Sequence, residues 1–518
     1  TATTTATPVP PDLALFADNV FLYPVAAIYA GEKVTFEAVA YVPDNISPDS
    51  VNVSLLVDNT PIATSHLNGR NLAGESLVLF EWVWDSTDQI GRHEARLILD
   101  PEDQIQIGDE NQANNTVDIT FTVLDRKLAP PDEKTATWVQ SETACCFVYT
   151  VTGTAANRDL AQLLPLVDKA FAQAVDRLNE EPDQKYTVYF IDRVIGQGGY
   201  AGSMMVVSYL DRQYAGNGLY QVLVHEAVHV LDREFAPQRI PFLAEGLAVW
   251  AAEGHYKPEN ILERTAALRQ IGEYIPLAEL VNNFYPVQHE IGYLEAAGLV
   301  NYLINTYGWA TFRSFYMDVT ADDAPTLAEA MDINLQIYYN RTLAQMEAEW
   351  LAFLDEVSVS ETAVADLETT IRYYNVMRQY QAQYDPTAHF LKAWLPHPER
   401  VRELGNPADL NRHPRTLINI TLEVMLQAAD LSMREGNYDR AHIILDSVSR
   451  VLANKGLFMD PLALSYFQLV QAATDLGYTV QKVSLTGNRA RIFVTRPGTE
   501  QLVELQWQLK NETWVLTN

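Results

Sequence analysis

The sequence predicts a multidomain protein with an N-terminal immunoglobulin-like β-sandwich, an α+β domain, a helical region and a small antiparallel β-sheet. Its 518 residues are enough for about three or four domains of ordinary size. A hydrophobic content of 48% is typical of a globular chain. Apolar residues alternate near the N-terminus and recur at helical spacing further on. We expect a stalk over 1–17, the sandwich over 18–126, the α+β domain over 135–357, helices over 358–477 and the sheet over 478–518.

The chain is strongly acidic, with 67 acidic and 36 basic side chains and a formal net charge of −31. Nucleic acids and anionic lipid surfaces are bound through Lys- and Arg-rich surfaces, so the balance argues against both as partners. The sequence also lacks a run of about 18 apolar residues, so we expect no transmembrane segment.

Residues 1–11 consist of Thr, Ala and Pro with one Val, a composition typical of an extended stalk. Such a stalk predicts an exported protein, extracellular or attached to the cell surface, that has lost a signal peptide or a lipid anchor. A cytosolic protein with a frayed N-terminus is the alternative. The two cysteines, Cys145 and Cys146, are adjacent, and we expect buried thiols rather than a strained disulfide.

The predicted sandwich rests on alternating strands at 34–42 and 51–57, followed by strands near 77–84, 92–99 and 116–124. The segment 100–116 is rich in oxygen ligands and resembles a loop of adhesion-type sandwich modules in bacterial surface proteins. A calcium ion could use Asp103, Asp109 and Glu110 there. A solvated acidic loop is the alternative.

The α+β domain should contain strands near 146–152, 186–191 and 204–209, with an amphipathic helix over 157–179 and mostly helices from 219 to 355. Helices continue to about 477, and 431–441 looks like the turn of one tetratricopeptide-type hairpin. Four final strands are expected, at 480–485, 489–495, 502–509 and 514–516.

The strongest functional signal is an H-E-x-x-H motif formed by His225, Glu226 and His229. On a helix the two histidines lie one turn apart on the same face and can bind one Zn²⁺. A catalytic zinc needs a third protein ligand. Glu245 follows Pro241, which suits the first turn of a new helix, and a tight helical hairpin would bring Glu245 back to the histidines. Glu253 is the second candidate.

The stretch from about 137 to 356 resembles the gluzincin metallopeptidases, distant relatives of thermolysin and aminopeptidase N. Three pieces support the resemblance: the block from His225 to Glu245, the Gly-rich run 197–202 that leads into 204–209, and the helix-like run 293–308. The resemblance implies a zincin-like fold and zinc on His225, His229 and Glu245.

In that family the Glu of the motif is the general base, which implies this role for Glu226. Tyr293 is the candidate donor to the oxyanion, with a core aromatic as the alternative. The strand 201–209 resembles a cleft edge that pairs with an extended peptide, and the residues before and within it, Gly199, Tyr200, Ala201 and Gly202, would approach substrate closely. An ordinary turn at these glycines is the alternative.

One position departs from the thermolysin pattern, because Val249 stands where that group has an Asp that orients a zinc histidine. Asp232, Glu253 or a backbone carbonyl must then accept the hydrogen bond that orients the histidine. The sequence thus predicts an exported zinc metallopeptidase acting on peptides or proteins. The alternative is a cell-surface binding or assembly protein that carries a catalytically silent zinc domain.

Overall fold

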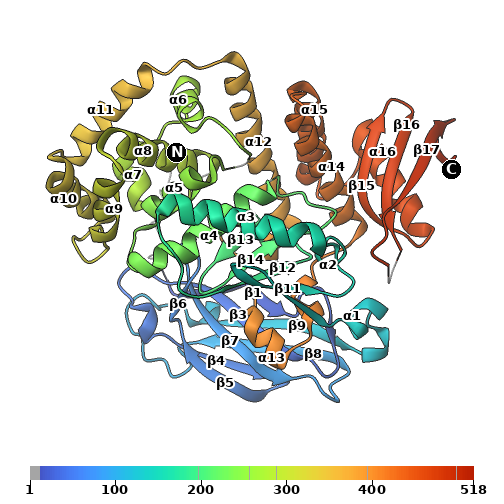
Figure 1. The fold of residues 1–518 in the computed structure, drawn as a ribbon. Coiled ribbons are helices and arrows are strands. Elements are labelled where there is room, and N and C mark those ends of the chain that lie inside the picture. The colour runs from blue at the N-terminus through green and yellow to red at the C-terminus, as the bar shows by residue number, and fades with distance from the viewer. Residues whose placement is uncertain are drawn as a thin grey trace, which may run out of the picture. The chain divides into compact units, whose positions relative to one another are not determined.

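The structure, a computed structural model, describes residues 12–196, 198–216, 218–255, 257–287, 289–393, 395–496 and 499–517, apart from the side chains of Asp132 and His289. Residues 1–11 of the expected stalk thus lie outside the described residues. The chain forms two compact units, Thr1–Lys134 with Leu395–His413, and Thr135–Trp394 with Pro414–Asn518 (Figure 1).

The first unit contains a sandwich of two β-sheets, as expected from the alternating strands. One sheet has the order β1 (Ala14–Tyr23), β3 (Lys33–Tyr41), β7 (Ser76–Asp85) and β6 (Gly69–Arg70). The other has the order β2 (Ile28–Tyr29), β9 (Thr116–Leu124), β8 (Gly91–Leu99), β4 (Asn52–Val57) and β5 (Thr60–His66). Short helical turns are η1 (Pro48–Ser50), η2 (Gln112–Asn114), η3 (Arg126–Leu128) and α1 (Pro131–Thr135). Alternate residues of β4 are buried, which is the period-two pattern of a strand with one face in the core.

Two boundaries of this unit differ from the prediction. Strand β1 begins at Ala14, so residues 14–17 belong to the sandwich and not to a stalk. The segment 395–413, expected in the helical region, also belongs to this unit. It carries α13 (Pro398–Leu404) and η5 (Pro407–Asn411). Arg412 is buried and donates to both oxygens of Glu32, at 2.9 and 2.6 Å, which ties the segment to the sandwich.

The second unit begins with a five-stranded sheet of order β10 (Trp138–Glu142), β11 (Cys146–Val151), β12 (Tyr186–Ile191), β14 (Met205–Ser208) and β13 (Gly199–Ala201). The three inner strands are parallel, and β10 and β13 run antiparallel to their neighbours. The expected edge strand at 201–209 was wrong. The chain turns back at Gly202, where the Gly202 N–H donates to the Met204 carbonyl, so β13 is the edge and β14 lies inside the sheet.

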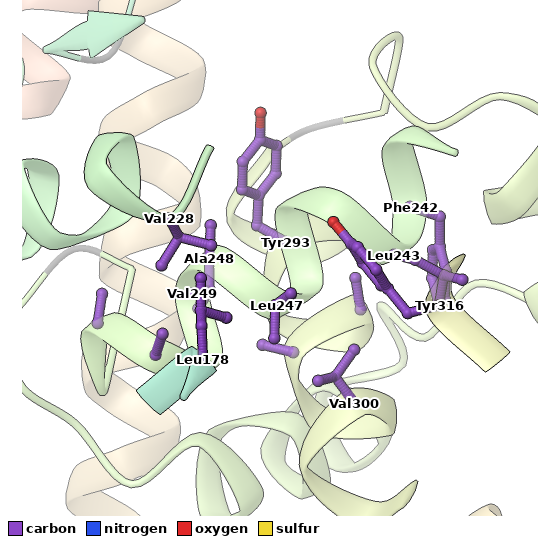
Figure 2. Packing of buried hydrophobic residues seen from close by; sticks show 14 of the residues in the cluster. Leu178, Val228, Phe242, Leu243, Leu247, Ala248, Val249, Tyr293, Val300 and Tyr316 are labelled. Carbon is purple, nitrogen blue, oxygen red and sulfur yellow. The ribbon is translucent and has the colours of Figure 1, made fainter. Parts of the chain in front are cut away.

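Helices of this unit pack on the sheet and on one another. In chain order they are α2 (Ala155–Arg158), α3 (Leu160–Leu178), α4 (Leu219–Phe235), α5 (Pro241–Ala252), α6 (Ile261–Ile271), α7 (Leu277–Asn282), α8 (His289–Tyr307), α9 (Trp309–Asp318), α10 (Leu327–Tyr339) and α11 (Leu343–Asp355). Helix α3 packs against α4, and α4 against α5, which in turn packs against α8. Figure 2 shows part of this core, where Leu247 and Val249 of α5 lie near Val228 of α4 and Val300 of α8.

The chain after residue 355 is less continuously helical than expected. Helix α12 (Glu361–Tyr384) is followed by η4 (Pro386–Ala388), and α14 (Leu417–Arg434) starts only at Leu417. Helices α14 and α15 (Tyr438–Ala453) form the expected hairpin. Helix α16 (Pro461–Asp475) precedes a four-stranded antiparallel sheet of β15 (Thr479–Thr486), β16 (Arg489–Thr495), β17 (Val503–Lys510) and β18 (Thr513–Leu516).

The prediction for the cysteines was wrong, because Cys145 and Cys146 form a disulfide with each other. The chain bends at Ala144 and Cys145 before β11 begins at Cys146, and this bend lets the neighbouring sulfurs meet. Among the described helices, none combines the length and the apolar character that a membrane span requires.

Candidate metal centre

The H-E-x-x-H motif lies in the middle of α4, and Glu245 lies in the second turn of α5. Pro241 occupies the first turn of α5, where its missing N–H costs nothing. The connection between the helices is only a few residues long, so α5 folds back on α4. This hairpin brings Glu245 to His225 and His229, as the sequence predicted for a third ligand.

The three side chains converge on one point. The Nε2 atoms of His225 and His229 are 3.0 Å apart, and the Glu245 Oε2 atom is 3.0 Å from the first and 3.1 Å from the second. Bond lengths of about 2.0–2.1 Å place tetrahedral zinc ligands about 3.3 Å apart, so the donor set and its spacing fit zinc. It is the only group of three or more His, Cys, Asp or Glu side chains within metal-binding distance in the described parts of the chain.

The electrostatics of the triad also suit a cation. Burial opposes ionisation of Glu245, yet His229 and His225 hold the pKa of this carboxyl well below its usual range. Burial lowers the pKa of His225 to about 4. For His229 the effect of burial is outweighed by Glu245, and its pKa rises to about 9. The buried Glu245 carboxylate is thus ionised, and the positive charge beside it is carried by His229.

Glu226 lies beside the edge strand β13. A Cβ atom on Gly199 would lie 3.1 Å from the Glu226 Oε1 atom and 3.0 Å from the Val206 carbonyl, so only glycine leaves this carboxylate its place. The Glu226 Oε2 atom is buried and has no hydrogen-bond partner among the described residues. Burial raises the pKa of Glu226 to about 8, as suits a group that exchanges protons near neutral pH.

Tyr293 of α8 lies beside the triad, with its ring 6.1 Å from that of His225 and nearly parallel to it. Figure 2 shows its hydroxyl directed away from Leu247 and Val300. Burial, followed by the charge of Glu245, raises the pKa of Tyr293 well above its usual value. The phenol therefore stays protonated, as a hydrogen-bond donor must. The residue is both a core aromatic and a neighbour of the site.

The other predicted substrate-binding residues follow the edge strand. Gly199, Tyr200 and Ala201 form β13, and Gly202 follows it. Tyr200 is 38% exposed, whereas the Ala201 carbonyl accepts a hydrogen bond from Arg233 of α4. The edge strand therefore lies beside the zinc-motif helix.

Two residues at the site were missed by the sequence analysis. The Tyr285 hydroxyl donates to the Glu245 Oε1 atom at 2.9 Å and so fixes the carboxylate orientation. Phe390, after α12, packs against the rings of Tyr285 and Tyr293 at 6.3 and 6.4 Å. Both lie in irregular segments, where no periodic pattern signals a contact.

The structure shows where each residue that could orient a zinc histidine lies. Glu253 ends α5 in a left-handed conformation and pairs with Arg177, so it is neither a ligand nor a partner of the triad. Val249 is buried in the hydrophobic core. Asp232 is buried on α4 and pairs with Arg239 at 2.7 Å.

The proposed calcium ligands are not brought together. Asp103 accepts from Gln112, Asp109 from Asn115 at 2.8 and 3.0 Å, and Glu110 from the Gly108 N–H at 3.2 Å. Since each carboxylate satisfies its own part of the loop, they do not form a common ligand set in the described residues.

No family model matches the sequence, and no curated protein matches it closely enough to count. Among solved structures, native yeast LTA4 hydrolase is similar at 10% identity over 90% of this chain and 98% of its own, with a TM-score of 0.34. An aminopeptidase N family protein from Idiomarina loihiensis matches at 12% identity over 98% of this chain and 97% of its own, with a TM-score of 0.18.

A CARDB domain from Pyrococcus furiosus, in complex with di-metal ions, matches at 18% identity over 24% of this chain and all of its own, with a TM-score of 0.18. All three TM-scores lie below 0.5, so these likenesses assign neither a fold nor a function.

Proposed function

We propose that this protein is an exported zinc metallopeptidase. The observation that carries the proposal is the convergence of His225, His229 and Glu245 within 3.0–3.1 Å of one another, with the carboxylate of Glu226 buried beside them. Two histidine nitrogens and one carboxylate oxygen are the ligand set of catalytic zinc in peptidases of the two-His, one-Glu type. Zinc bound there supplies Lewis-acid chemistry, acidifying water and polarising a peptide carbonyl.

The residues around the triad divide the remaining work. Glu226 accepts the proton of the attacking water and delivers it to the leaving amine, a role for which its pKa of about 8 is suited. Tyr293 donates its phenolic proton in a hydrogen bond to the oxygen that becomes negative as the carbonyl is attacked. The edge strand β13 lies next to Glu226 and pairs with the backbone of an extended peptide.

Two features support export. The Thr- and Pro-rich residues 1–11 are typical of a stalk. A disulfide between Cys145 and Cys146 persists in the oxidising compartments outside the cytosol. Both features support the proposal that the protein acts outside the cell or at its surface.

The test is metal analysis combined with hydrolysis of a peptide library by the full chain. We expect about one zinc per chain in wild type. Glu226→Gln should keep that zinc and lose about 10²–10⁴-fold in hydrolysis, because only the proton carrier is removed. Glu253→Gln is the matched control, since this exposed carboxylate pairs with Arg177, and it should keep both properties.

Absence of stoichiometric zinc in wild type would rule out the proposal. Zinc with no hydrolysis in any variant would favour the alternative, a binding or assembly protein with a silent zinc domain. The replacement of the thermolysin-type Asp by Val249 is the observation that keeps this alternative in view.

A further inference from the structure

One ring nitrogen of His229 makes no hydrogen bond in the metal centre described above. Its Nε2 atom faces Glu245 and His225, at 3.1 and 3.0 Å. Its Nδ1 atom is buried and makes no hydrogen bond within the described residues. A histidine that binds a metal through Nε2 carries its proton on Nδ1, and that N–H needs an acceptor that fixes tautomer and ring orientation.

Among the described residues, Asp232 has an acceptor oxygen without a donor, which complements the His229 Nδ1 atom. It is completely buried and lies three residues after His229, on the same face of α4. Its Oδ2 atom accepts from the Tyr316 hydroxyl at 2.5 Å and pairs with Arg239 at 2.7 Å. Its Oδ1 atom is buried and has no hydrogen-bond partner in the described chain. An acceptor left without a donor in the interior costs about 1–3 kcal/mol.

Arg239 and Tyr316 determine the state of this carboxylate. A guanidinium and a phenol on the same oxygen hold the carboxylate in place, and they offset part of the burial that raises the pKa of Asp232. Arg239 also donates to the His229 backbone carbonyl at 3.2 Å, so it ties the carboxylate to the turn of α4 that carries the ligand. The free oxygen is thus a prepared acceptor one helical turn from a donor without a partner.

We propose that Asp232 is the positioning residue of the metal centre and accepts a hydrogen bond from His229 Nδ1–H through its Oδ1 atom when zinc is bound. This rests on the proposed zinc site. In thermolysin-type enzymes a carboxylate on the helix of the Glu ligand orients a zinc histidine. This chain has the buried Val249 at that position, and the proposal gives the same function to Asp232 on α4. The bond forms by rotation of side chains, since residues three apart on a helix face one another.

The test uses the full chain loaded with zinc and a chelator competition that measures zinc affinity. Asp232→Ala and Asp232→Asn should each lose about 10–100-fold in affinity, the usual effect of removing such a partner. In Asp232→Asn one amide oxygen cannot serve His229 and the Arg239–Tyr316 side together. Tyr316→Phe is the matched control, because it removes a hydrogen bond from the same carboxylate and leaves Oδ1 and the charge unchanged.

A second readout separates positioning from folding. In wild type with ¹⁵N-labelled histidine, NMR should show His229 protonated at Nδ1 with a downfield, hydrogen-bonded proton when zinc is present. That proton should persist in Tyr316→Phe. Equal zinc affinity in wild type and the Asp232 variants, an equal loss in Tyr316→Phe, or no hydrogen-bonded Nδ1 proton in wild type would each overturn the proposal. Should an Asp232 variant fail to fold, the wild-type NMR result decides. Failure of wild type to bind zinc would instead refute the proposed function.

Discussion

Replacing Gly246 by alanine should disturb the metal centre through the backbone, because Gly246 sits next to the ligand Glu245 where α5 crosses α8. A Cβ atom there would lie 2.8 Å from both the carbonyl carbon and the oxygen of Ala296, whereas ordinary contact starts at 3.4 Å. The two helices would have to separate by about 0.6 Å, since neither helix backbone gives way as a side chain does.

Two energy terms oppose each other in this variant. Overpacking costs about 1–3 kcal/mol. Alanine in a helix interior returns about 1 kcal/mol relative to glycine. We expect a net destabilisation of up to about 2 kcal/mol, and weaker zinc binding because the ligand shifts by more than the about 0.5 Å that such sites tolerate.

The assay is thermal unfolding together with chelator competition for zinc. Gly292→Ala is the matched control, because Gly292 is also in a helix but its Cβ would meet only the ends of side chains, with Leu280 Cδ1 at 3.3 Å. We expect this variant to be neutral or more stable, with unchanged zinc affinity. Gly246→Ala that is as stable as Gly292→Ala and binds zinc as tightly as wild type would refute the packing argument.

Three further predictions follow from local geometry and charge. Gly199→Ala should reduce hydrolysis and leave zinc binding unchanged, because its Cβ would lie 3.1 Å from the Glu226 Oε1 atom. Gly202→Ala is the control and should change neither property, because its Cβ would meet nothing within 4 Å. Equal hydrolysis rates in the two variants would contradict this. Burial raises the pKa of Glu295 well above 4.5, so the folded protein keeps a proton that the unfolded chain releases, and stability falls as pH rises above about 4.5. Glu295→Gln should flatten that slope in urea titrations between pH 5 and 8, and parallel slopes would count against the reasoning. Arg412→Ala should leave the buried Glu32 carboxylate with Arg126 as its cationic partner and without the two hydrogen bonds of Arg412, at a cost of about 1.5–3 kcal/mol. The loss should be seen as lost amide-exchange protection in the sandwich, and unchanged protection would show that the Arg412–Glu32 pair is not needed.

The metal triad was predictable because its information is local. The i, i+4 spacing puts His225 and His229 on one face, and Pro241 marks the start of the helix that carries Glu245. Only a short connection separates the two helices, so few chain paths are open to it. The strands of the sandwich were equally readable, since their alternation is a property of each strand alone.

Contacts between distant segments were not predictable in this way. Tyr285 and Phe390 reach the site from irregular segments, where the sequence holds no period that marks a partner. The edge strand was misplaced because the alternation of 199–209 does not show where the chain reverses. Tyr316, which holds the Asp232 carboxylate, lies 84 residues away from it in the chain.

The return of 395–413 to the sandwich unit has a consequence for synthesis. At about 5–20 residues per second, residue 413 emerges roughly 14–56 s after residue 134. Until then the buried Glu32 carboxylate has Arg126 as a partner but lacks the two hydrogen bonds of Arg412, so the N-terminal unit is incomplete while the rest of the chain is made. The sandwich therefore completes its folding late although it is synthesised first. A nascent chain stopped before residue 395 should be a substrate for chaperones and proteases, which sense such incomplete units.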